Sequence, residues 1–183
     1  VAGGVFVIET VMKLFPVRFE SMGSQKLFKR NFLPTREKLH SKLADKKKLL
    51  IVALLWLVLN GFIAHLYLKH AIDTGAMVLV SLFYSVCDMI CVLFYCPFQQ
   101  IMGNKCCNTC RIHNWDYIMI ATPLVFIDSL YAKALFCIAA VIFIRWEYTV
   151  WKHPERFYEK TNASLKCVNC KETRCSRKIM KKA

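Results

Sequence analysis

The sequence is short of acidic residues and lacks charge almost entirely in two long stretches. It has 12 Asp and Glu against 26 Lys and Arg in 183 residues, a formal net charge of +14. Residues 49–68 carry no charge, and residues 76–96 carry one, Asp88. With a hydrophobic content of 56%, this segregation excludes an ordinary soluble domain and predicts an integral membrane protein. The basic excess then fits cytoplasmic loops beside membrane spans, and we expect no nucleic-acid partner.

The sequence also lacks the motifs of several enzyme classes. It has no glycine-rich phosphate loop, nucleophile elbow or dinucleotide fingerprint, and no internal repeat. No positively charged region precedes the first apolar stretch, so residues 1–17 do not resemble a signal peptide. Because the chain begins with Val1, we expect an upstream segment. Residues 1–17 are then either the end of an upstream helix or an interfacial helix.

The two uncharged stretches predict a transmembrane hairpin over residues 49–96. Residues 49–68 would form about 30 Å of helix, which matches the hydrocarbon core. Residues 76–96 form the second span and are followed by Pro97. The preceding segment, residues 18–48, holds ten Lys or Arg and is expected to be cytoplasmic.

Residues 117–144 are apolar again, but Asp128 and Lys133 fall in the middle. A single helix would bury both near the bilayer centre, at a cost of a few kcal/mol each. A re-entrant or short helical hairpin would place them at its crest, with arms of about 11 residues each. The hairpin also keeps the basic tail, residues 145–183, on the same side as residues 18–48 and 97–116. We therefore predict a break between Pro123 and Lys133.

Cysteine is abundant, and its spacing indicates a metal site. Six of the ten cysteines fall in two tight clusters, each containing a C-x2-C motif, which together supply a four-thiolate site. The expected ligands are Cys107, Cys110, Cys167 and Cys170, with Cys106 and Cys175 as spare ligands or redox partners and His113 as a further candidate. The cofactor would be zinc or an iron–sulfur cluster. Disulfides and unligated thiols remain alternatives.

The two cysteine clusters can meet only if both lie on one face of the membrane, which the hairpin topology provides. The other four cysteines, Cys87, Cys91, Cys96 and Cys137, are expected to be packing residues. The sequon Asn162-Ala163-Ser164 has no consequence if the tail is cytoplasmic.

These observations favour a small all-α membrane subunit with a Cys-rich cytoplasmic metal-binding face. It would contact anionic lipid headgroups and join other membrane subunits or copies of itself, with electron transfer as one role. A thiol-redox enzyme using a C-x2-C pair is an alternative, so enzyme activity stays open. A transporter using Asp88, Asp128 and His65 is another, although Asp88 and His65 are more simply hydrogen-bonding residues between helices.

Overall fold

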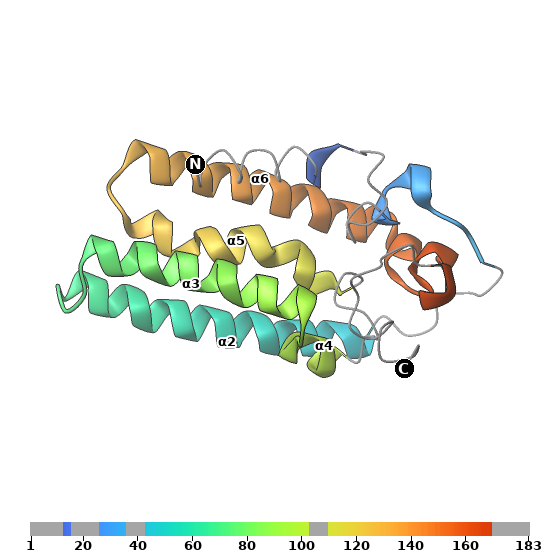
Figure 1. Ribbon diagram of the computed structural model, residues 1–183, viewed down its shortest axis with the longest axis horizontal. Coiled ribbons are helices and arrows are strands. Elements are labelled where there is room, and N and C mark those ends of the chain that lie inside the picture. Colours follow the sequence, from blue (N-terminus) through green and yellow to red (C-terminus); the bar gives the residue numbers. More distant parts are fainter. Residues whose placement is uncertain (1–12, 16–25, 36–42, 103–109, 170–183) are drawn as a thin grey trace.

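The computed structural model describes residues 13–15, 26–35, 43–102 and 110–169 (Figure 1). Every named element in these ranges is a helix, and extended pairing there is limited to an isolated bridge between Pro34 and Asn162. The all-helical class expected from the sequence is therefore confirmed for the described part of the chain.

Three helices are long and apolar enough to cross a membrane. They are α2 (Leu43–Leu68), α3 (Thr74–Leu93) and α6 (Leu130–Lys152). Their outward side chains are large and apolar, for example Val58 on α2 and Phe83 on α3, which are 71% and 62% exposed. Apolar surface on this scale indicates contact with lipid or with a partner protein. The helices therefore support an integral membrane protein.

The helices α2 and α3 form the first hairpin. α2 ends at Leu68, and two residues later His70 adopts a left-handed backbone with φ 57°. This lets the Ala71 amide donate to the Leu66 carbonyl at 3.0 Å. Asp73 then caps α3, because its carboxylate accepts a hydrogen bond of 2.8 Å from the Ala76 amide. The turn between the spans is thus short and fixed by local hydrogen bonds.

A mixed helix precedes α6. It consists of the 3₁₀ helix η4 (Arg111–Trp115), the α-helix α5 (Asp116–Ala121) and the 3₁₀ helix η5 (Thr122–Phe126), which follow one another without a gap. At rises of about 2.0 Å per residue for 3₁₀ and 1.5 Å for α-helix, the three segments extend about 29 Å. This first arm has more than the expected 11 residues because it begins at Arg111. Its 3₁₀ parts also make it longer than an α-helix with the same number of residues.

The chain breaks between the mixed helix and α6 at residues 127–129, inside the interval in which the sequence predicts a bend. Asp128 lies in this break and is exposed, and its carboxylate accepts a hydrogen bond of 2.6 Å from Lys133. Both charged side chains therefore lie at the connection between the mixed helix and α6.

The second arm, α6, extends beyond residue 144, the end of the apolar segment predicted from the sequence. Its last turns contain Arg145, Glu147 and Lys152, and such charges are typical of a polar tail outside the helix. In the structure the same turns bury Trp146 and Val150, which are 4% and 9% exposed. Because this buried face continues the apolar stripe of α6, the helix extends to 23 residues.

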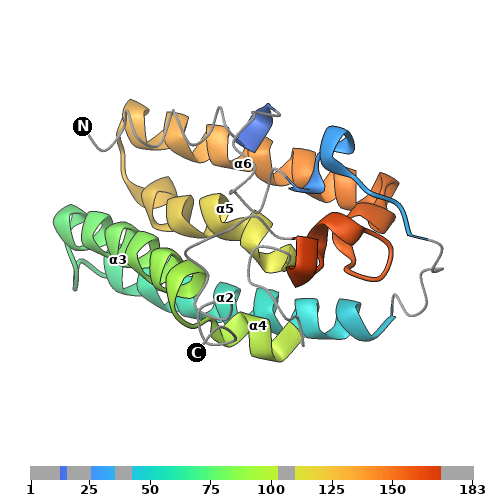
Figure 2. The same ribbon diagram turned by 45° about the vertical axis from the view of Figure 1, so that its right-hand side comes forward.

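Figures 1 and 2 show which segments share an end of the helical bundle. At one end lie the start of α2, the end of α3, α4 (Pro97–Met102), the start of η4 and the end of α6. The short helices η6 (Pro154–Phe157), η7 (Ala163–Leu165) and η8 (Cys167–Asn169) follow at this end, which we call the polar end. The connections 69–73 and 127–129 lie at the opposite end, the turn end.

The polar end has a hydrophobic core of its own. The core joins α5 and α6 to the segment after α6 and to residues near Leu27, and its buried members are Leu27, Tyr117, Ala121, Ala139, Ile142, Trp146, Val150, Phe157 and Leu165. A hydrogen bond of 2.8 Å from the Ala163 amide to the Leu33 carbonyl and one of 3.1 Å from Thr35 to Thr161 add a backbone connection. The segment after α6 is therefore folded against the bundle.

Candidate functional site

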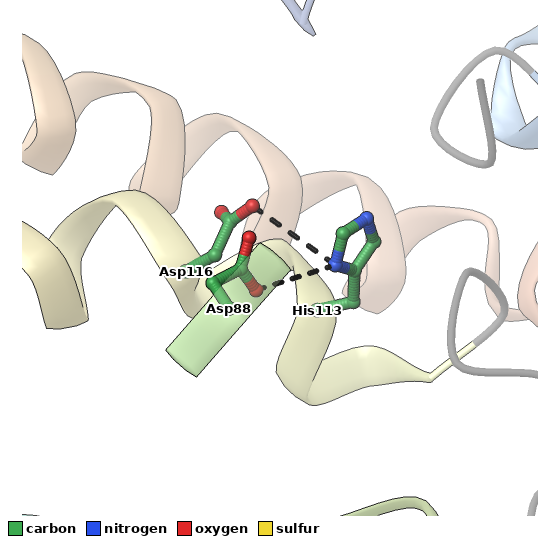
Figure 3. Close-up of side chains that lie close together, drawn as sticks. All are labelled: Asp88, His113 and Asp116. Atoms are coloured by element: carbon green, nitrogen blue, oxygen red, sulfur yellow. Dashed lines mark ion pairs between the residues drawn. The ribbon is translucent and has the colours of Figure 1, made fainter. Parts of the chain in front are cut away.

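Three potential metal-ligating side chains meet at the polar end, each from a different element. Asp88 comes from α3, His113 from η4 and Asp116 from the first turn of α5. One ligand atom from each can be chosen so that all three atoms lie within 4.8 Å of one another. Figure 3 shows the His113 ring directed between the two carboxylates, with its Nδ1 4.0 Å from Asp88 Oδ1 and 4.0 Å from Asp116 Oδ2.

The histidine of this cluster is neutral at neutral pH. Burial lowers the pKa of His113 to about 4; the nearby Asp116 opposes this shift and Lys13 adds to it. The two 4.0 Å contacts are therefore not ion pairs at pH 7, although they would become so on protonation. Nδ1 is buried and has no hydrogen-bond partner in the described part of the chain. A neutral imidazole nitrogen without a partner is available as a metal ligand.

A lysine already balances one carboxylate of the cluster. The Lys13 ammonium forms an ion pair with Asp116 and lies 4.1 Å from the centroid of the Tyr117 ring. The side chains of Lys13 and Asp116 are only 11% and 6% exposed, so this pair is largely shielded from solvent. Besides His113, the cluster therefore contains two acidic side chains, Asp88 and Asp116, and one basic side chain, Lys13.

A second polar network fixes η4 against α6. Glu147 on α6 accepts hydrogen bonds from Trp115 Nε1 at 2.7 Å and from Arg111 Nε at 3.2 Å, and a second Arg111 nitrogen bonds its other oxygen. This bidentate pairing holds a planar guanidinium in one orientation. The backbone that carries His113 is thereby held in place.

The structure describes two of the six predicted cysteine ligands, and both lie at the polar end. Cys110 precedes η4 and is 2% exposed, in a buried cluster with Val52, Met102, Ile112 and Met119. Cys167 is the first residue of η8. The other four, Cys106, Cys107, Cys170 and Cys175, lie outside the described residues.

The residues considered for a transporter do not come together. Asp128 lies at the turn end with its side chain 97% exposed, whereas Asp88 lies in the last turns of α3 near the polar end. His65 lies on an exposed part of α2. Ser81, on the same helical face as Asp88, donates a hydrogen bond of 2.7 Å to the Ile120 carbonyl and so joins α3 to α5.

Sequence reasoning identified Asp88 and His113 separately but missed Asp116 and Lys13. His113 and Asp116 are three residues apart, a spacing that places them on one side of a helix. Their approach to Asp88 and Lys13 depends on tertiary packing, which no local pattern reports. No family model, curated protein or solved structure matches the chain, so the site is interpreted from its geometry alone.

Proposed function

We propose that this chain is a small integral membrane subunit whose polar end carries a four-thiolate metal site. The ligands are Cys107, Cys110, Cys167 and Cys170, with Cys106 and Cys175 in reach, and the metal is zinc or iron in an iron–sulfur cluster. The observation that carries this proposal is the position of Cys110 and Cys167. They are far apart in sequence, one from each C-x2-C motif, yet both lie at the same end of the bundle.

The topology supports the proposal. The mixed helix η4–α5–η5 carries the chain from the polar end to the turn end, and α6 brings it back (Figures 1 and 2). This segment begins at the polar end with η4 and is the first arm of the second hairpin, which we interpret as re-entrant or short, with its backbone buried in protein. Segments 18–48, 97–116 and 145–183 hold 23 of the 26 Lys and Arg. The positive-inside rule therefore assigns the polar end to the cytoplasm.

The segment after α6, which carries Cys167, has a backbone held by side-chain hydrogen bonds. Asn162 is fully buried and donates to the Arg156 carbonyl at 2.9 Å, and its side-chain oxygen accepts from the Leu33 amide at 3.3 Å. Asn169, beside Cys167, donates to the Ala163 carbonyl at 2.9 Å. Holding ligand-bearing backbone before metal binds reduces the entropy cost of closing the site.

Metal content and an absorption spectrum of the purified protein test this proposal. We expect about one metal ion or cluster per chain, colourless for zinc and brown for an iron–sulfur cluster. Cys107→Ser and Cys170→Ser should each abolish stoichiometric binding, while Cys137→Ser, which changes an exposed cysteine on α6, should leave it intact. Wild-type protein without zinc or iron, or equal metal content in all variants, would contradict the proposal.

A second candidate function is divalent-cation binding by Asp88, His113 and Asp116. The buried, unpartnered Nδ1 of His113 between two carboxylates favours it. Atoms within 4.8 Å of one another have a central point within about 2.8 Å of each, so small shifts reach the 2.0–2.6 Å of metal–oxygen and metal–nitrogen bonds. Carboxylate and imidazole ligands suit Mn²⁺ or Zn²⁺, and the Lys13 ammonium would act as a built-in competitor for Asp116.

Titration with Mn²⁺, followed by the loss of its free-ion electron paramagnetic resonance signal, tests this second site. Lys13→Met should tighten Mn²⁺ binding by about tenfold or more, because it removes a cation paired with Asp116. His113→Gln should weaken it. Asp128→Asn, which neutralises an exposed carboxylate at the turn end, serves as the control. If Lys13→Met and His113→Gln bind Mn²⁺ like the control, the assignment is wrong.

A further inference from the structure

A cavity at the polar end is lined by three cations. Its volume is about 160 Å³, and Lys29, Arg145 and Arg156 lie in its wall. These residues come from three separate elements: the 3₁₀ helix η2 (Lys29–Asn31), α6 and η6. Packing of the fold, and not a run in the sequence, brings the three charges together.

Within the described part of the chain, no carboxylate pairs with any of these three cations. Arg111 and Lys133, by contrast, have carboxylate partners in Glu147 and Asp128. Like charges around one cavity repel each other, and the repulsion is relieved when an anion enters. The cavity therefore has the electrostatics of an anion site.

A fixed aromatic side chain forms part of the same wall. Trp146 lines the cavity and is 4% exposed, and its Nε1–H is buried without an acceptor in the described residues. The ring is held by edge contacts with Phe28 and Phe157, at centroid distances of 5.3 and 6.1 Å, so it cannot readily turn toward solvent. The ring therefore forms a fixed part of the cavity wall.

The cavity lies at the level of a membrane surface. Arg145, Trp146 and Thr149 belong to the last turns of α6, one of the three candidate spans. On the same turns, Tyr148 and Trp151 are 55% and 79% exposed, as expected for aromatic residues at the boundary between lipid and water. Phospholipid phosphates lie at this depth.

We propose that this cavity binds the phosphate of an anionic phospholipid headgroup. Phosphate oxygens accept from Arg145 and Arg156, which offer planar bidentate donors. Lys29 adds a positive charge that favours a headgroup with net negative charge over a zwitterionic one, since a choline cation would be repelled. This inference does not depend on either metal site.

Native mass spectrometry of the full chain in detergent tests the proposal and separates lipid from free phosphate. The protein is titrated with phosphatidylglycerol, with phosphatidylcholine of the same acyl chains, and with inorganic phosphate. We expect phosphatidylglycerol to bind at least about tenfold tighter than phosphatidylcholine. We expect the combined Arg145→Gln and Arg156→Gln variant to lose this preference, because each charged hydrogen bond contributes about tenfold or more.

The matched control is Lys69→Gln, which removes an exposed cation at the turn end and should retain the preference. Equal affinity for the two lipids in the wild-type protein would overturn the proposal. So would an unchanged preference in the double arginine variant, in which both substituted side chains lie at the cavity and are at most half-buried. Binding of inorganic phosphate without binding of phosphatidylglycerol would overturn the assignment to a lipid.

Discussion

At the residue scale, His113 gives the protein a specific dependence on pH. Because burial holds its pKa at about 4, below the usual 6.5, the unfolded state binds more protons than the folded state between these values. The stability that depends on neutral His113 is complete above pH 6.5 and is lost as the pH falls toward 4. The loss is at most about 1.4 kcal/mol per pH unit.

Thermal unfolding in detergent with a metal chelator measures this dependence. The unfolding temperature should fall between pH 7 and pH 5, and His113→Gln should flatten the fall because glutamine does not titrate. Parallel pH profiles for the wild-type and His113→Gln proteins would show that His113 does not titrate in this way.

Asn162 illustrates a residue whose role the sequence disguised. Asn162-Ala163-Ser164 reads as a glycosylation sequon, but the asparagine is fully buried. Its side-chain oxygen caps η7 by accepting from the Ser164 amide at 3.1 Å, and its amide donates to the Arg156 and Lys26 carbonyls. Asn162 therefore stabilises a local turn and joins the segment after α6 to the backbone at Lys26.

Replacing Asn162 with Ala should destabilise the polar end by roughly 2–3 kcal/mol, because several buried backbone groups lose their partner. Limited proteolysis should then cut residues 153–169 faster, while the hairpin of α2 and α3 stays protected. Asn169→Ala removes an exposed amide from the same segment and should have a smaller effect. Equal proteolysis of the two variants would argue against Asn162 as the anchor.

At the scale of elements, the spans were predictable because charge is excluded from them. The uncharged run of α2 and the nearly uncharged run of α3 set helix positions without tertiary information. The break near Asp128 was predictable for the same reason, since an ion pair is costly inside a bilayer. The end of α6 was not, because Arg145 and Glu147 resemble a polar tail until the burial of Trp146 between them is known.

The two candidate metal sites also differ in whether the sequence alone predicts them. The C-x2-C motifs are local patterns and can be recognised in the sequence. The cluster of Asp88, His113 and Asp116 instead exists only because α5, which directly follows η4, packs against α3. Lys13 is separated from Asp116 by 103 positions, so its pairing could not be anticipated from spacing.

The turn between α2 and α3 contains a correctable strain. His70 has φ 57°, a conformation that costs a residue with a side chain about 1–2 kcal/mol and glycine much less. His70→Gly should therefore stabilise the protein by about 0.5–1 kcal/mol, after allowing for the greater freedom of glycine in the unfolded chain. The measurement is the unfolding temperature in detergent. Lys69→Gly, one residue earlier, should give no such gain, and equal shifts would contradict the explanation.

At the scale of the whole molecule, the two hairpins place the start of the mixed helix and the segment after α6 at the same end of the bundle. We therefore expect both on the same side of the membrane. In a variant without native cysteines, Lys160→Cys should react with an impermeant maleimide only after cells are permeabilised. Lys69→Cys at the turn end should react in intact cells. Reaction of both positions from the same side would exclude the topology, and reversed labelling would place the polar end outside the cytoplasm.

The segment from Arg111 to Phe126 combines 3₁₀ and α-helical turns, so its length depends on how its 3₁₀ turns are wound. Its two 3₁₀ parts, η4 and η5, together hold ten residues, each of which rises about 0.5 Å more than in an α-helix. Rewinding both parts to α-helical pitch would shorten the segment by about 5 Å, nearly the rise of one α-helical turn. With the crest at Asp128 fixed by α6, this contraction would move Asp116 by about 2.5 Å and His113 by about 4 Å toward the turn end, relative to Asp88. The contacts among these side chains therefore depend on how tightly this one segment is wound.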